Sequence, residues 1–465
     1  MMKDITKTYI RQIIDMKIEN IPESVIKETR RALLDTIGCM VAGVQSPIGK
    51  SAIQALGAMG GPKEATVIGD GRKLTAPIAA YINGQCCVGP DLSDNFKPGS
   101  IIITHPAEGV IPPVLALAEK TGATLKDLFL AIIAGYETAG RYAHAIEPRR
   151  PEVYSFTTHY GVAGGVACAK LLNCEEEKAV NLLGIAGTLA PLPVTIPMWG
   201  FREGERPASW HRDMPGHSSF AVVTAALFAD TDFKATHLLL EESTAFYKIA
   251  GSDHYRAECL FENWGKSFVL EKITYKSIPS CYFNQPCIEA VRVCIEENSI
   301  RLDEIEKIEL YAPTNLAKNF IYYPPQTPVD TASSVKYLTA MFLLTGNPGP
   351  DWYLNFEKYL KSEAYEKIAD RIVVYEDKKL QKILEREEKL FGKAVIKTAG
   401  ATYEKIVDVV RGADQKPFSM KEIEEKCTML TEPVLGKKKA ERIVKTVQEA
   451  ELNSGVRDMV ALLQP

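Results

Sequence analysis

Apolar residues recur at helical spacing through most of the first 265 positions of the chain. Between Pro22 and Val44, apolar side chains at intervals of three and four residues define one face of a helix. Similar runs predict further helices over residues 74–87, 110–120, 125–145, 161–172, 175–190 and 220–228. Residues 65–68 are a short extended candidate, and residues 191–216 have too many prolines and charges for a regular element. This part of the chain is therefore predicted to be almost wholly helical.

The pattern changes between residues 268 and 412, where alternation of apolar and polar positions becomes common. Strands are predicted at residues 273–278, 305–311, 371–375, 391–396 and 404–410, and helices at 284–297 and 333–344. From Pro417 the chain returns to helices. The prediction is a mostly α fold. A large all-helical domain is built from both chain ends, residues 1–267 and 413–465, and a smaller α+β lid domain is inserted at 268–412.

Length, charge and cysteine usage narrow the class of protein. A chain of 465 residues is longer than a single hydrophobic core usually supports, so two domains are expected. A net charge of -4 gives no sign of the basic surface that nucleic-acid binding needs. The apolar runs are too short to span a bilayer, and residues 1–12 lack the apolar stretch of a secretory signal. Ten cysteines without a CxxC pair indicate reduced thiols rather than a zinc site. We expect a cytoplasmic protein with no nucleic-acid or membrane partner.

Ionisable residues collect in one loop between two predicted helices. Asp91 and Asp94 lie in a short polar turn, residues 95–103 form a loop with glycine and proline, and His105 precedes a proline. Such loops concentrate function because the scaffold positions them. Carboxylates and an imidazole together can transfer protons. The structural alternatives are a helix cap or Asx turn at Asp91 and a solvated imidazole at His105.

Seven stretches in register resemble the MmgE/PrpD family, whose members include 2-methylcitrate dehydratase, cis-aconitate decarboxylase and iminodisuccinate epimerase. The stretches are LLDTIGCMVAG (33–43), NGQCCVGPDLSDN (83–95), THPAEGVIPPVLALAE (104–119), AGYETAGR (134–141), ACAKLLNC (167–174), YKSIPSC (275–281) and PQTPVDTASSVKYLTAMFLLTG (325–346). The resemblance implies a large helical domain with a smaller α+β lid, a homodimer, and no metal or organic cofactor. It also implies proton transfer beside a carboxylate group of the substrate.

The resemblance also implies catalytic residues. Asp91 falls at the first active-site aspartate of the family, in DLSDN where relatives usually read DFDDT, and His105 falls at the family's His-Pro step. Lys276 matches the lysine of a KxxP motif, and Tyr337 matches a tyrosine at the end of the Asp330–Tyr337 stretch. We expect Asp91, His105 and His159 to share the proton transfers, and Lys276 and Tyr337 to hold the substrate. An exposed lysine and a core tyrosine are the structural alternatives.

Five further residues are predicted to bind the substrate. Asn95 stands where relatives have threonine, and Lys97 lies in a loop a few residues longer than is usual in the family. Thr157 keeps a family threonine. Ser155 and His211 stand where many relatives have histidine and lysine. The alternative for Lys97 is a solvated side chain.

Two departures from the family pattern bear on the substrate. The histidine that Ser155 replaces could be supplied by His159, four residues later, although a histidine at a helix start is the plainer interpretation. Met214 stands at a second family histidine. Because these polar positions differ from those of many relatives, the motif matches do not predict that this protein acts on the usual substrates of the family.

The leading hypothesis is a cofactor-free lyase of the dehydratase type. It would remove a proton alpha to a carboxylate of a small di- or tricarboxylate. The alternatives are an epimerase or isomerase, a decarboxylase, and a non-catalytic protein that binds a carboxylate. The same base and the same cation would serve the three reactions, so the sequence does not divide them.

Overall fold

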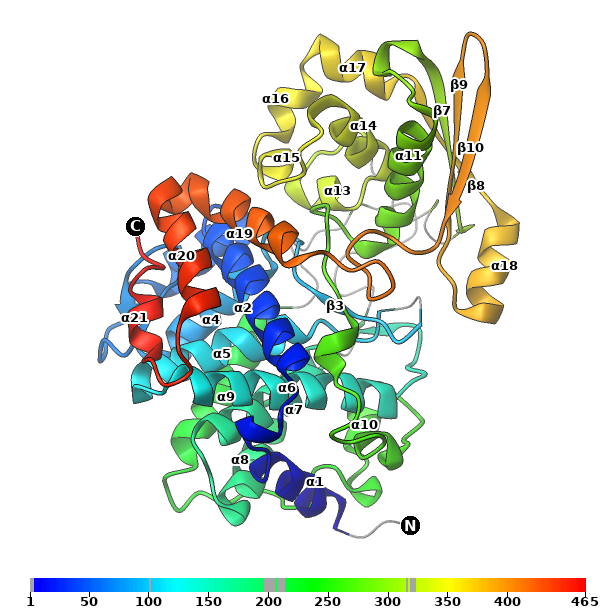
Figure 1. Cartoon of the computed structure of the whole chain (residues 1–465). Helices are drawn as coiled ribbons and strands as arrows, with labels where there is room; N and C mark the ends of the chain where they lie inside the picture. Colours follow the sequence, from blue (N-terminus) through cyan, green and yellow to red (C-terminus); the bar gives the residue numbers. More distant parts are fainter. Residues whose placement is uncertain are drawn as a thin grey trace.

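The computed structural model describes residues 4–99, 102–154, 156–195, 206, 214–314, 317 and 323–465. Figure 1 shows a helical body that contains both chain termini and, above it, a smaller unit with a sheet. The fold is mostly α, as predicted. The helices of the body are α1 (Ile5–Ile14), α2 (Glu23–Gly43), α3 (Pro47–Leu56), α4 (Ala76–Val88), α5 (Pro106–Thr121), α6 (Leu125–Ala145), α7 (Phe156–Leu171), α8 (Glu176–Leu189), α9 (Pro215–Phe228), α10 (Phe246–Ile249), α19 (Met420–Leu435), α20 (Lys437–Glu449) and α21 (Val456–Val460).

Local sequence explains where several of these helices begin and end. Thr124 and Asp127 form a reciprocal capping box at the start of α6, as predicted. Gly122 closes α5 in the left-handed conformation, with φ of 73°. Helix α5 begins four residues earlier than predicted, because Pro106 fits the first helical position, where no donor is needed.

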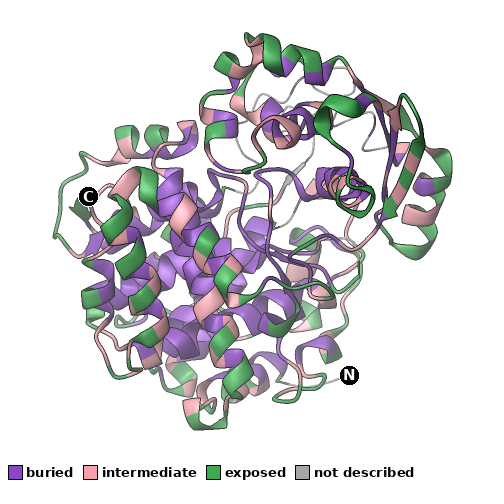
Figure 2. Ribbon diagram, turned by 45° about the horizontal axis from the view of Figure 1, so that its top comes forward, coloured by how far each residue is buried: buried purple, intermediate pink, exposed green. Residues whose placement is uncertain are grey.

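Small residues let the inner helices approach closely, as predicted for the glycine-rich run of α7. Gly164 faces the carbonyl oxygen of Gly109 on α5, which a Cβ atom would meet at 2.8 Å. Gly43, at the end of α2, lies against the backbone of Cys86 on α4. The buried residues in Figure 2 accordingly concentrate in the middle of the helical body. The chain then leaves α4 directly into the turn that contains Asp91.

The smaller unit is built on a four-stranded sheet in the order β10-β9-β7-β8. Its elements are α11 (Gln285–Asn298), β7 (Ile305–Ala312), α13 (Pro328–Ala332), α14 (Val335–Thr345), α15 (Asp351–Leu354), α16 (Phe356–Leu360), α17 (Glu363–Ala369), β8 (Ile372–Glu376), α18 (Lys378–Glu387), β9 (Gly392–Thr398) and β10 (Thr402–Val407). Strands β7 and β8 are parallel, and β9 is antiparallel to β7 and β10. Ile308, Ile372 and Ile396 pair across the sheet and contribute to a core of their own.

Short two-stranded pairs lie outside this sheet. They are β1 (Ala65–Thr66) with β2 (Lys73–Leu74), β3 (Asn95–Phe96) with β6 (Ile273–Thr274), and β4 (Val153–Tyr154) with β5 (Val194–Thr195). The strand predicted at 273–278 is wrong in its extent, because it ends at Thr274, and it pairs with β3 rather than with the sheet of the smaller unit.

The chain returns from the smaller unit to the helical body near its end. Helix α19 packs against α2, and α21 packs against α5. The predicted domain boundaries at 267/268 and 412/413 stay a prediction. By length and composition, no single helix among the described residues could cross a bilayer, although α2 and α3 pass such a test as a bent pair.

Candidate functional site

The predicted site is centred on the four-residue turn 91–94, which follows α4. Asp91 has φ of 51°, a conformation that is uncommon for a residue with a side chain. Its amide donates to the carbonyl of Val88 at 2.9 Å, and its carbonyl accepts from the amide of Ser280 at 3.2 Å. Such a conformation persists only where the surroundings hold it. The turn is therefore a place where the fold fixes one carboxylate in one direction.

Lys276 is the direct partner of Asp91. The pairing of β6 with β3 brings the segment after Thr274 alongside the turn, and Lys276 Nζ lies 2.5 Å from Asp91 Oδ1. The lysine side chain is 3% exposed and the aspartate side chain 14%. Burial opposes the charge on Lys276, but the adjacent Asp91 carboxylate outweighs burial and raises the lysine pKa. The structure thus joins two residues, 185 positions apart, that the sequence singled out separately.

Each other residue of the turn is held by a different element. The carbonyl of Leu92 accepts from Lys426 of α19 at 2.9 Å. The hydroxyl of Ser93 donates to Glu108 of α5. Asp94 accepts from the Tyr136 hydroxyl of α6 at 2.7 Å and from the amide of Ala107 at 3.1 Å. Both Asp94 oxygens are therefore engaged in holding α5 and α6 to the turn.

Burial raises the pKa of Asp94 to about 7. Because the folded pKa is higher than the unfolded one, the folded state binds this proton more tightly. The contribution to stability is therefore greatest below pH 4 and declines as the pH rises towards 7. We expect a slope of about 1.4 kcal/mol per pH unit that is lost in Asp94→Asn. Urea unfolding of both proteins from pH 4 to 8 measures it, and parallel curves would contradict it.

His105 is positioned by the backbone of the same turn. Its Nδ1 lies 2.7 Å from the carbonyl oxygen of Asp94, and the residue is the N-cap of α5. A carbonyl only accepts hydrogen bonds, so Nδ1 carries the proton and, in neutral imidazole, the lone pair is on Nε2. The structure therefore orients His105 as a proton acceptor through Nε2, by a contact with Asp94, three residues after Asp91 in the same turn.

Phe156 connects His105 with the other predicted histidine. Its ring centroid lies 5.2 Å from that of His105 and 5.8 Å from that of His159. The guanidinium of Arg149 lies over the same phenylalanine, 4.8 Å from the centroid. Burial and the nearby Arg149 charge hold the pKa of His159 well below its usual value. His159 is therefore neutral at pH 7, so it can act as a base but not as a cation that binds an anion.

The predicted binding residues have different surroundings. Asn95 is fully buried in β3, and neither polar atom of its side chain makes a hydrogen bond to the described residues. The buried hydroxyl of Thr157 likewise makes no hydrogen bond to the described residues. Lys97 is buried rather than solvated, and its amino group lies 5.8 Å from the ring centroid of Tyr282. Burial lowers the pKa of Lys97. Its side chain thus joins the loop to the segment that follows Lys276.

Of the remaining predicted residues, some lie outside the described part of the chain and others lie away from the turn. Ser155 and His211 lie outside the described residues. Tyr337 is buried in the core of the smaller unit, where its hydroxyl donates to the carbonyl of Trp352 at 2.5 Å. Met214 precedes α9 and is exposed. The structure therefore brings Lys276 to Asp91, ties His105 to Asp94 of the same turn, and gives Tyr337 a packing role within the smaller unit.

Sequence reasoning missed several residues that support the turn. Asp35 on α2 forms an ion pair of 2.6 Å with Lys426. Its signal in the sequence was an acidic residue inside the apolar run of residues 33–37. Glu108 and Tyr136 lay within matched stretches but carried no distinct pattern. Arg149 lay in a segment without helical or strand periodicity.

The described residues contain no group of three or more His, Cys, Asp or Glu side chains that could hold a metal ion. All ten cysteines are free thiols and all are buried. Burial raises the pKa of Cys39, Cys86 and Cys87, the three nearest the turn in sequence, so none of them is a ready thiolate. Carboxylate and imidazole groups near the turn are therefore better suited to proton transfer than these three thiols.

Known protein families match almost the whole chain. Residues 10–257 match the model of the MmgE/PrpD N-terminal domain, and residues 278–452 match that of the MmgE/PrpD C-terminal domain. The second match includes α19, so the family division by sequence differs from the packing, in which α19 lies on α2.

Curated relatives carry one name in common. Cis-aconitate decarboxylase of Homo sapiens is 29% identical over 202 residues, which cover 42% of this chain and 41% of that protein. The enzyme of Aspergillus terreus is 30% identical over 186 residues, 38% of this chain and 37% of the relative. The cis-aconitate decarboxylase-like protein oryM of Aspergillus oryzae is 22% identical over 489 residues, 99% and 97% of the two chains. The first two matches thus span about two fifths of those relatives.

Proposed function

The chain belongs to the MmgE/PrpD family, and from this premise we propose that it is a lyase that acts on a small di- or tricarboxylate by removing a proton alpha to a carboxylate. The observation that carries the proposal is the buried contact of Lys276 with Asp91, beside an imidazole oriented through Asp94. The pair supplies a cation for a substrate carboxylate, and the ionised Asp91 holds that cation in place. We also propose that it works as a homodimer.

The proposed steps start from the buried Asp91–Lys276 pair. A lysine has three N–H donors, and Lys276 directs one of them to Asp91 at 2.5 Å. Another donor binds the substrate carboxylate and stabilises the negative charge that develops on it when the adjacent C–H bond breaks. His105 Nε2 takes that proton. The electron pair forms the new double bond, and the imidazolium of His105 returns a proton to the beta-hydroxyl group, which leaves as water, while Asp91 stays ionised beside Lys276.

Decarboxylation is the second candidate, and the names of the relatives favour it. In that reaction the bond between the alpha carbon and a carboxylate breaks, carbon dioxide leaves, and the carbon takes up one proton. The same lysine would hold the remaining carboxylate, and protonated His105 or Asp91 would supply the proton. Epimerisation would use His105 on one face of the carbon and a second acid on the other.

The test begins with a panel of small di- and tricarboxylates. Binding to the folded state raises the unfolding temperature by mass action, so a thermal shift names the compounds to assay. Each hit is then incubated in D₂O and followed by NMR. A new alkene signal indicates dehydration, loss of one carbon indicates decarboxylation, and deuterium at one carbon without other change indicates epimerisation. Binding without any of these outcomes would establish the non-catalytic alternative.

His105→Asn is the variant that tests the base. The asparagine amide can still donate to the carbonyl of Asp94, but it lacks the Nε2 lone pair. We expect turnover to fall by about 10²- to 10⁴-fold with little change in unfolding temperature. His237→Asn, in the loop after α9, is the matched control and should keep wild-type turnover. Equal turnover in His105→Asn and the wild type would remove His105 from the mechanism.

A further inference from the structure

Lys426 reaches the site from the far end of the chain. It lies on α19, is buried, and donates to the carbonyl of Leu92, 334 positions away, at 2.9 Å. That carbonyl belongs to the residue directly after Asp91. The side chain of Leu92 also shares a small apolar cluster with Leu430 of α19, and the hydrogen bond from Lys426 adds a polar contact from the same helix.

Asp35 anchors the lysine from the other side. It is fully buried in the middle of α2, and its Oδ1 lies 2.6 Å from Lys426 Nζ. Neither oxygen of Asp35 accepts a well-directed hydrogen bond from the described residues, so its charge rests on the ion pair. Burial raises the pKa of Asp35. The lysine is thus held between an anion on α2 and a backbone carbonyl in the turn.

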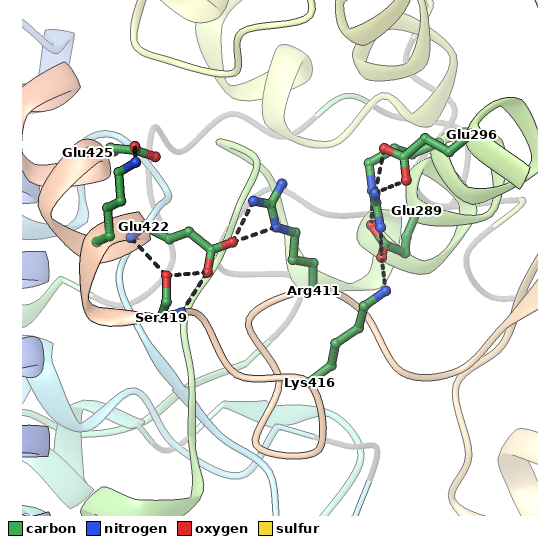
Figure 3. A network of polar contacts seen from close by, with 9 residues as sticks. Glu289, Glu296, Arg411, Lys416, Ser419, Glu422 and Glu425 are labelled. Carbon is green, nitrogen blue, oxygen red and sulfur yellow. Dashed lines mark hydrogen bonds and ion pairs between the residues drawn. The ribbon is translucent and has the colours of Figure 1, made fainter. Parts of the chain in front are cut away.

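The segment that returns from the smaller unit fixes the start of α19. Ser419 caps the helix through a reciprocal box with Glu422, and Arg411 binds the same Glu422 (Figure 3). Lys416 of the same segment pairs with Glu289 of α11 at 3.2 Å, which ties it to the smaller unit. Glu422 and Lys426 are four residues apart and both line a cavity of about 220 Å³ between α19 and the smaller unit. The position of Lys426 therefore depends on both units.

We propose that Lys426, anchored by Asp35, is a positioning residue for the Asp91–Lys276 pair. It holds the Leu92–Ser93 peptide, one residue beyond Asp91, and so keeps the Asp91 carboxylate directed at Lys276. This inference rests on the proposed function of the same site. Without the contact, the strained Asp91 conformation relaxes by rotation about its own backbone bonds, and a displacement of about 1 Å at a reacting group can cost about 100-fold in rate.

A purely structural role for the ion pair predicts something different. If Lys426 and Asp35 only stabilised the fold, loss of activity would follow loss of stability. Removing one partner of a buried pair is strongly destabilising, whereas replacing both with neutral groups of similar size is often neutral. A variant with both residues replaced by neutral side chains therefore distinguishes a positioning role from a structural role. It restores stability but does not restore the hydrogen-bond donor to the Leu92 carbonyl.

The experiment compares Lys426→Met, Lys426→Arg and the double variant Asp35→Asn/Lys426→Met in the full chain. Lys170→Met is the matched control, since Lys170 is also buried and donates to two backbone carbonyls, those of Ile14 and Met16. We expect kcat to fall about 10- to 100-fold in Lys426→Met, with KM changed less than about threefold. The double variant should recover unfolding temperature but not kcat, Lys426→Arg should recover part of kcat, and Lys170→Met should keep kcat.

Two results would overturn the positioning role. One is recovery of kcat together with stability in the double variant, and the other is an equal loss of kcat in Lys170→Met. If Lys426→Met fails to fold, the double variant carries the test. Lys276→Met in the same assay distinguishes failure of the proposed function from failure of the inference about Lys426. Its full activity would remove the proposed function, whereas its inactivity beside unchanged kcat in the double variant would remove only the inference about Lys426.

Discussion

Lys276→Met should lose about 10²- to 10³-fold in turnover. Methionine keeps the length of the lysine stem but removes the cation that binds the substrate carboxylate and orients Asp91. Breaking a buried ion pair typically lowers the free energy of unfolding by about 3–5 kcal/mol. We expect a smaller loss here, because the Asp91 side chain retains some exposure to water. Steady-state kinetics and urea unfolding measure the two effects separately.

Lys272→Met is the control for this substitution. Lys272 precedes β6, lies four positions from Lys276 and is exposed, so its loss should leave turnover and stability near the wild-type values. A double-mutant cycle of Lys276→Met with Asp91→Asn should show strong non-additivity, because the two side chains act on each other. Additive effects would indicate that the contact at 2.5 Å does not matter to the reaction.

Gly43→Ala should have the largest effect on stability. A Cβ atom at this position would lie 1.8 Å from the carbonyl oxygen of Cys86 and 2.5 Å from its carbonyl carbon. Both are backbone atoms of α4, so no side-chain rotation relieves the clash and the two helices must separate. We expect a loss of at least about 3 kcal/mol in the free energy of unfolding, measured by urea denaturation.

Gly60→Ala is the matched control, because a Cβ atom there meets no heavy atom within 4 Å. Its free energy of unfolding should stay within about 0.5 kcal/mol of the wild type. The Gly43 variant should also lose activity, since α4 leads directly into the turn at Asp91. Equal urea midpoints for the two alanine variants would show that α2 and α4 do not meet as closely as the structure shows.

The regular elements of the body could be predicted because each has one apolar face or a clear cap. The capping box at Thr124 marks the start of α6, and β7 occupies Ile305–Ala312 where a strand was predicted at 305–311, although its buried positions do not alternate strictly. Helices α1, α3 and α18 were missed. The strand at 273–278 was overextended, because the pattern shows which residues prefer extended backbone but not which partner strand ends first.

In the site, too, some residues could be predicted from the sequence and others could not. Asp91, His105 and Lys276 were predicted from motifs; the structure pairs Lys276 with Asp91 and ties His105 to the same turn, while their roles in the reaction stay a prediction. The contacts that hold them could not be predicted, because Asp35, Tyr136 and Lys426 come from three helices that are far apart in sequence. An acidic residue within the apolar run of α2 indicated that a buried partner must exist. Only the fold identifies that partner as Lys426.

The return of α19 to the helical body has a consequence for how the site is made during translation. Every residue proposed to carry out the chemistry lies before position 300, and so leaves the ribosome before α19 does. The helical body can begin to form as its early helices emerge, since N-terminal units generally fold first. The turn at Asp91, however, lacks the donor from Lys426 until residues 420–435 have been synthesised. A nascent chain would thus carry all the reactive groups for some time without the support that makes them act together.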